Sequence, residues 1–82
     1  MQRIALKTAQ ALIEAGCRAV EIVERPRGYA ICIEGDILRS VREDELTFLT
    51  IDGVVNYVRR HLAPPSPPAL RVTIECVRPG AR

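Results

Sequence analysis

The segment 42–62 constrains the fold most, because it joins a short apolar run directly to an amphipathic helix. Residues 45–49 have a strand-like pattern, and residues 50–53 read as the cap that starts the helix. One helix face then carries apolar residues at the i, i+3, i+4, i+7 and i+11 positions, namely Ile51, Val54, Val55, Val58 and Leu62. Such a stripe predicts a helix that packs on a sheet, and therefore a mixed α and β architecture.

Further periodic patterns predict the remaining elements. Residues 2–15 should form a helix that ends at Gly16. Residues 19–24 and 29–34 should form a hairpin around the turn at 25–28, and residues 37–41 a third strand. Residues 46–49 are either a short fourth strand, which we favour, or an extended segment that leads into the second helix.

The proline-rich segment 63–69 cannot continue a helix, because proline lacks the amide donor and clashes with the preceding turn. We expect a semi-rigid connector that returns the chain to the sheet, and favour this over a ligand for proline-recognition domains. Residues 70–77 then alternate as in a strand. Their core side should carry Leu70, Val72, Ile74 and Cys76, and their solvent side Arg71, Thr73 and Glu75.

Together these elements predict an α+β two-layer sandwich in the order α-β-β-β(-β)-α-β, with a mainly antiparallel sheet and both helices on one face. The 82 residues suffice for one domain, which we place at 1–78, followed by a flexible tail at 79–82. The open face of the sheet should carry mixed polar and charged residues. It is either solvated or a docking surface, and the sequence leaves both alternatives open.

Composition narrows the class of protein. No apolar run approaches the roughly 20 residues that cross a bilayer, so we expect no membrane association and a cytoplasmic location. The three cysteines are Cys17, Cys32 and Cys76, an odd number without C-x-x-C spacing. We therefore expect reduced thiols, no metal site and no cofactor.

The residue types that carry catalysis do not gather into a motif. His61 is the only histidine and lies near the end of the second predicted helix. Ser40 and Ser66 have no base in a recognisable motif, and the acidic residues 43–45 lack the spacing of a metal loop. We expect a protein that is not an enzyme.

Eleven arginines and one lysine face ten acidic residues, which gives a net charge of +2. Arginine binds phosphate in a bidentate way, so two pairs of arginines are candidates for contacts with nucleic acid: Arg25, Arg27, Arg59 and Arg60. The few aromatic residues look scattered rather than interleaved with these arginines. We favour a solvated surface, and codon bias in a GC-rich genome would give the same arginine excess.

Three blocks of the chain resemble the ParC-type accessory proteins of plasmids and integrated mobile elements, a family unrelated to the topoisomerase subunit of that name. The resemblance lies in a helix that ends in Ala-Gly, a strand that starts with Gly-Tyr-Ala, and an Asp-capped helix that ends in Arg-Arg. These motifs lie within residues 6–16, 20–30 and 48–60. The chain departs from the family pattern in its connector at 63–69, which replaces a shorter link.

The resemblance implies a small accessory protein in the partition or maintenance of mobile DNA, and no catalytic residues carry over from the family. We also expect no small-molecule cofactor. We expect a protein-interaction module that self-associates or binds a protein partner through the open sheet face or an unpaired edge strand. The alternative is a weak DNA-binding factor that uses Arg25, Arg27, Arg59 and Arg60.

Overall fold

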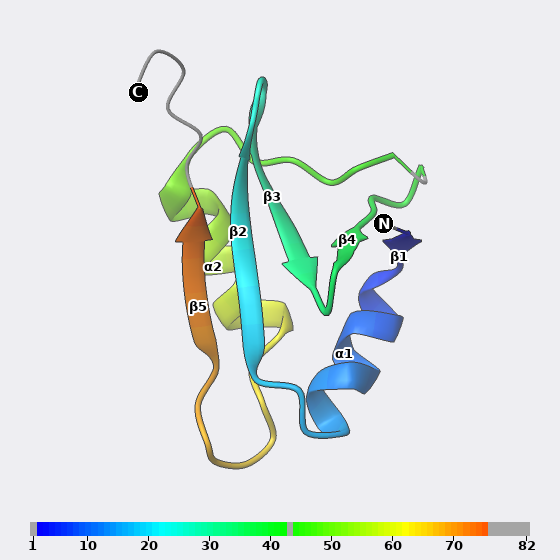
Figure 1. The fold of residues 1–82 in the computed structure, drawn as a ribbon, viewed down its shortest axis with the longest axis vertical. Helices are drawn as coiled ribbons and strands as arrows, with labels where there is room; N and C mark the ends of the chain where they lie inside the picture. Colours follow the sequence, from blue (N-terminus) through cyan, green and yellow to red (C-terminus); the bar gives the residue numbers. More distant parts are fainter. Residues whose placement is uncertain (1, 43, 76–82) are drawn as a thin grey trace.

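A computed structural model describes residues 2–42 and 44–75 of the 82-residue chain. These residues form a small α+β fold with a five-stranded mixed sheet and two helices (Figure 1). In chain order the elements are β1 (Arg3–Ile4), α1 (Leu6–Glu14), β2 (Ala19–Arg25), β3 (Gly28–Ile33), β4 (Asp36–Leu38), α2 (Ile51–His61) and β5 (Arg71–Glu75).

The strands lie in the order β1-β4-β3-β2-β5. The β2–β3 and β3–β4 pairs are antiparallel, whereas β1–β4 and β2–β5 are parallel. The sheet is therefore mixed, and the prediction of a mainly antiparallel sheet is not confirmed. Both parallel pairs join strands that are distant in the chain, and residue periodicity does not reveal such pairings.

The N-terminus differs from the predicted helix at 2–15, because a short strand precedes α1. The N–H of Ile37 donates to the carbonyl of Gln2 at 2.8 Å, and that of Arg39 donates to Ile4 at 2.9 Å. Pairing with β4 thus holds Arg3 and Ile4 extended, and α1 begins only at Leu6. The element order gains a strand at its start.

The predicted hairpin is confirmed, with β2 and β3 in register from Glu21–Cys32 to Arg25–Gly28. The fourth strand forms only in part. The main chains of Tyr29 and Phe48 exchange two hydrogen bonds of 2.8 Å, and Arg39 and Glu45 form a second isolated bridge. The chain leaves the sheet after β4, which is shorter than predicted, and Phe48 returns to pair with the start of β3.

Helix α2 agrees with the predicted cap and stripe. Thr50 is extended and its hydroxyl accepts a hydrogen bond from the N–H of Gly53 at 3.0 Å. Such a cap satisfies a backbone donor that the first helical turn cannot. Val54, Val58 and Leu62 are buried. Neither helix within 2–42 and 44–75 is long and apolar enough to cross a membrane.

The buried side chains form two clusters. The larger contains residues of both helices, of three strands and of the C-cap of α2: Ala9, Ile13, Val20, Ile22, Ile31, Ile33, Leu38, Val54, Val58 and Leu62. The smaller contains strand residues alone, namely Ala30, Cys32 and Ile37, with Val23 packed against them. Alternate residues of a strand point to opposite faces, so the two clusters lie on opposite faces of β3.

The last strand corrects one prediction. Val72 and Ile74 pair with the fully buried Val20 and Ile22, but they remain 41% and 46% exposed. They lie on the expected side of the sheet, at its last strand, where a neighbour is present on one side only. The predicted core position Cys76, the last predicted strand residue Val77 and the predicted tail lie outside the described residues.

Candidate functional site

The candidate arginines of the hairpin lie next to acidic residues. The Nε atom of Arg25 lies 3.0 Å from a carboxylate oxygen of Glu45. Arg25 and Arg27 line a shallow hollow that Asp44 and Glu45 also line. The positive charge at this end of the molecule is therefore partly balanced, which weakens its attraction for phosphate.

Arg59 and Arg60 are exposed on the last turn of α2. They line a different hollow of about 530 Å³, together with Phe48, Gly53, Asn56, Tyr57 and His61. This hollow shares no residue with the one at the hairpin. The structure thus places the four candidate arginines in two separate pairs.

An aromatic cluster that the sequence pattern did not predict lies beside Arg59 and Arg60. The ring centroids of Phe48 and Tyr57 are 5.0 Å apart, and those of Tyr57 and His61 are 4.5 Å apart. Burial raises the pKa of the Tyr57 phenol. Four-residue spacing on a helix predicts the contact of Tyr57 with His61, whereas Phe48 joins them only through the fold.

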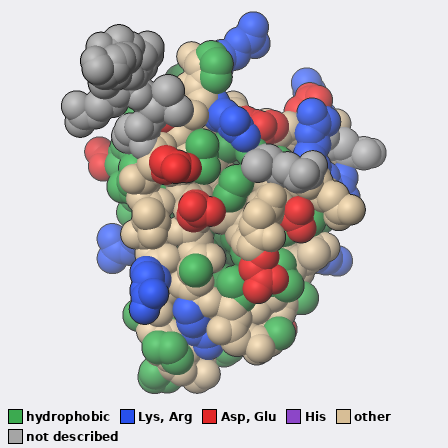
Figure 2. Space-filling view, viewed as in Figure 1, with side chains coloured by type: hydrophobic (Ala, Val, Ile, Leu, Met, Phe, Trp, Pro, Cys, Tyr) green, Lys and Arg blue, Asp and Glu red, His purple; other side chains and the backbone are tan. Residues whose placement is uncertain are grey.

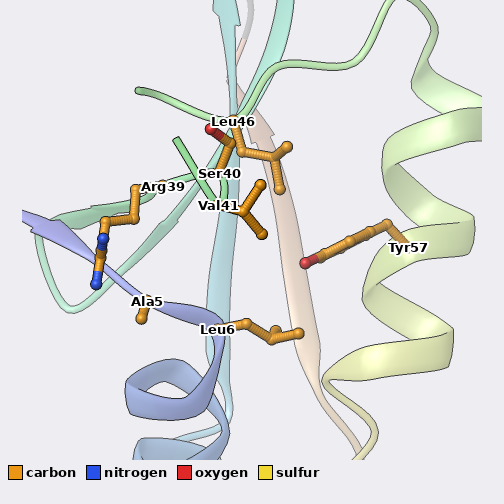
Figure 3. A pocket seen from close by; sticks show the side chains of 7 residues that line it. All are labelled: Ala5, Leu6, Arg39, Ser40, Val41, Leu46 and Tyr57. Atoms are coloured by element: carbon orange, nitrogen blue, oxygen red, sulfur yellow. The ribbon is translucent and has the colours of Figure 1, made fainter. Parts of the chain in front are cut away.

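A mostly apolar hollow of about 520 Å³ opens between the start of α1, the segment after β4, and α2 (Figure 3). Leu6 and Leu46 line it, and Tyr57 extends from α2 toward it with its hydroxyl foremost, whereas Arg39 points away. The hydroxyl of Ser40 accepts a hydrogen bond from the N–H of Arg42 at 3.1 Å. This lining offers apolar contact more than acid–base chemistry.

The cysteines within the described residues behave as packed thiols. Cys32 is 4% exposed and Cys17 is partly buried. Burial raises the pKa of the Cys32 thiol, and the carboxylate of Glu21 adds to this rise. Among residues 2–42 and 44–75, no three histidine, cysteine or acidic side chains gather in a way that could hold a metal ion.

The sheet face opposite α2 has a mixed surface. In the view of Figure 2, acidic side chains and apolar side chains are interleaved near the centre, and most lysine and arginine side chains lie toward the margins. The register places Glu21, Thr73 and Glu75 on the same face as Cys32. A face that carries both signs of charge is better suited to contact a protein than to bind a uniformly negative partner such as nucleic acid.

The outer edge of β5 carries exposed apolar side chains. It is the last strand of the described sheet, and both of its apolar side chains are more than two-fifths exposed. The N–H of Arg71 donates to the carbonyl of Arg18 at 2.6 Å, so Arg71 directs its backbone polar groups toward β2. Thr73 and Glu75 do the same in this parallel register.

Val72 and Ile74 consequently direct their N–H and C=O groups away from β2, to the outer edge. The same two residues present their exposed apolar side chains on the face that carries Val20 and Ile22. Backbone donors and acceptors and an apolar surface therefore coincide at two neighbouring positions. This combination is what an added β-strand needs.

Comparison of the chain with family models, with curated proteins and with solved structures finds no match. Among the surfaces described above, the edge of β5 presents both outward-directed backbone groups and exposed apolar side chains at the same two residues.

Proposed function

We propose that this protein is a small non-catalytic interaction module, and that it binds protein by adding a strand to its sheet at the outer edge of β5. The exposure of Val72 and Ile74 at that edge is the observation that carries the proposal. A role in the partition or maintenance of plasmids or integrated mobile elements is supported by the sequence resemblance to ParC-type proteins.

The proposal includes a layered arrangement in which both helices pack on one face of the sheet. The larger buried cluster supports this, because it joins Ala9 and Ile13 of α1 and Val54 and Val58 of α2 to the same strands. In that arrangement α1 and α2 cover the same face of the inner strands, and β5 is the last strand at one end of the described sheet. An added strand would widen the sheet and cover the side chains that the helices leave exposed.

Exposed strand edges are a liability that proteins usually reduce with charges, prolines or bulges. At β5 the two residues that direct their backbone groups outward are both β-branched and apolar. Isoleucine and valine favour the extended conformation and pack well against cross-strand neighbours. The edge is thus built to pair rather than to avoid pairing.

Fluorescence anisotropy of a labelled extended peptide tests the proposal. The probe is a seven-residue peptide of alternating threonine and valine, and its control carries N-methyl groups on alternate amides. We expect the first peptide to bind and the second not to. Val72→Lys should weaken binding by about tenfold, the effect of losing the burial of one apolar side chain.

Val41→Lys is the matched control, because Val41 is 100% exposed and lies far along the chain from β5. It should leave peptide binding unchanged. Equal loss from Val41→Lys and Val72→Lys, or equal binding of the N-methylated peptide, would show that general hydrophobicity rather than the β5 edge holds the probe.

A second candidate function is weak DNA binding through Arg59 and Arg60. The observation that favours it is their position beside the rings of Phe48, Tyr57 and His61. Arginines bind phosphates, and aromatic rings stack on bases. Arg25 and Arg27 would add a second contact, although Glu45 competes for Arg25.

Anisotropy of a labelled random duplex at low and near-physiological salt separates the two functions. Phosphate contacts lose affinity steeply as salt rises, whereas strand addition hardly responds. Charge reversal at Arg59 and Arg60 should abolish any duplex binding that those residues provide. Duplex affinity that survives this reversal would rule out the second candidate.

A further inference from the structure

We infer that β5 pairs with β5 of a second copy of this chain, in antiparallel orientation, with a two-fold axis that passes beside Thr73. The inference rests on the proposed function, because it requires that the β5 edge accept a strand. It goes further by naming the partner, the orientation and the register. The result would be a ten-stranded sheet that is continuous across two molecules, twice the five strands of one.

Backbone geometry supports the orientation. Val72 and Ile74 direct their N–H and C=O groups to the outer edge. A two-fold axis at Thr73 places Val72 opposite Ile74 of the second copy. Opposed residues that both direct their backbone groups at the partner strand exchange two hydrogen bonds in an antiparallel ladder. The axis creates two such residue pairs.

Charge complementarity supports the register. The same axis places Arg71 opposite Glu75 of the second copy, and Glu75 opposite Arg71, so both pairs join opposite charges. An axis at Val72 would instead place Arg71 opposite Thr73 and Glu75 opposite Ala69, which leaves the charges unpaired. Among the registers centred on β5, the axis at Thr73 matches every residue of the strand with a suitable partner.

The apolar side chains support the same choice. Val72 and Ile74 continue the face that carries Val20 and Ile22. Two copies would bring four β-branched side chains together on that face, next to the existing core. An interface of this kind is isologous, because the same patch serves on both copies.

Sedimentation velocity of two charge variants tests the inference. Arg71→Glu places two acidic pairs across the axis, and Glu75→Arg places two basic pairs there. We expect the wild-type chain to sediment as a dimer at high concentration, and each single variant to lose about tenfold or more in dimer affinity. Far-UV circular dichroism checks that both variants remain folded.

The decisive sample is the equimolar mixture of the two variants. One chain then carries acidic residues at positions 71 and 75, and the other carries basic residues at both. The antiparallel register pairs them at both ends, so the mixture should form a heterodimer as stable as the wild-type dimer. Single variants that dimerise like the wild type, or a mixture that stays monomeric, would overturn the inference.

A cross-link gives an independent test of the axis. Non-hydrogen-bonded antiparallel pairs have Cα atoms about 4.5 Å apart, which a disulfide can span. Thr73→Cys, in a chain with Cys17→Ser and Cys76→Ser, should therefore form a disulfide-linked dimer under mild oxidation. Thr47→Cys in the same background is the exposed control and should remain monomeric. Equal cross-linking of both would contradict the axis.

The outcomes separate this inference from the proposed function. A wild-type chain that stays monomeric at millimolar concentration, yet binds the threonine–valine peptide at β5, would refute self-pairing and retain the interaction module. A chain that binds neither itself nor the peptide would refute both.

Discussion

The guanidinium of Arg18 donates a hydrogen bond from Nε to the main-chain carbonyl of Pro68, at 2.8 Å. The same group donates to the carbonyl of Ser66 at 3.2 Å and to those of Ile13 and Cys17. One side chain thus joins the end of α1, the turn before β2 and the proline-rich connector. This anchoring brings β5 to β2, where the main-chain N–H of Arg71 donates a hydrogen bond to the main-chain carbonyl of Arg18.

Replacing Arg18 should therefore release β5. We expect Arg18→Ala to cost about 1–2 kcal/mol of unfolding free energy, because hydrogen bonds from a charged group are stronger than average. Arg18→Lys should cost nearly as much, since an ammonium group cannot reproduce the planar fork of donors. Urea denaturation measures both variants.

The control for Arg18 is Arg59→Ala, which removes an exposed arginine from the surface of α2 and should change stability by less than about 0.5 kcal/mol. Amide exchange gives the local readout. The N–H of Thr73 should exchange faster in Arg18→Ala, while that of Ile31 in β3 should change less. Uniform acceleration of both amides would show that Arg18 stabilises the whole domain rather than the connector.

Gly28 and Gly35 both have positive φ angles, +144° and +82°, but only Gly28 is crowded. A Cβ at position 28 would lie 2.1 Å from the carbonyl oxygen of Phe48, whereas position 35 has open space. We expect Gly35→Ala to cost about 1–2 kcal/mol, the strain of the left-handed region. Gly28→Ala should cost at least about 3 kcal/mol, because the Phe48 bridge must also break. Thermal unfolding that ranks the two variants equally would contradict this account.

Sequence pattern predicted the hairpin and α2 because both depend on neighbours in the chain. Alternating apolar residues and Gly28 define the hairpin, and Thr50 with its apolar stripe defines α2. The strand β1 escaped prediction, since Arg3 and Ile4 are extended only through pairing with β4. Periodicity reports which face a residue occupies and not which strand lies beside it.

The hydroxyl of Thr50 accepts the N–H of Gly53 and so caps α2. Thr50→Ala should lower the unfolding free energy by about 1 kcal/mol, whereas Thr50→Ser keeps the acceptor and should be close to neutral. Chemical denaturation with circular dichroism at the helix signal compares the two. Similar losses in both variants would assign the effect to the threonine methyl group instead of the cap.

The pKa of Cys32 predicts how stability depends on pH. Burial, and next the carboxylate of Glu21, raise this pKa above its ordinary value of 9.0, and the guanidinium of Arg25 partly opposes them. The folded state therefore holds the thiol proton more tightly than the unfolded state. The stabilisation is fully present below the ordinary pKa and is lost as pH rises through the higher folded value.

The unfolding free energy should thus fall as the pH rises from the ordinary thiol pKa of 9.0 to the higher pKa of the folded state. Cys32→Ala should remove part of that fall. Tyr57, whose pKa burial raises above 10.0, should add a later fall that Tyr57→Phe removes. A pH profile that is the same in the wild type and in Cys32→Ala would contradict this assignment.

The residues of the candidate site could be predicted from the sequence, but their arrangement could not. Alternation correctly placed Val72 and Ile74 on the core side, but it predicted burial, because the sequence does not state that β5 ends the sheet. The four candidate arginines were visible, whereas their separation into two hollows follows from tertiary structure. The same holds for Phe48, which joins Tyr57 only through the bridge to Tyr29.

Amide hydrogen exchange at β5, as a function of protein concentration, tests the central claim most directly. Thr73 provides an internal reference, because its N–H points at β2 in every state. We predict that the amides of Val72 and Ile74 exchange fast in dilute protein and become protected as concentration rises, while Thr73 stays protected throughout. If Val72 and Ile74 exchange equally fast at every concentration, and also with the threonine–valine peptide in excess, β5 is not a pairing edge and the account is wrong.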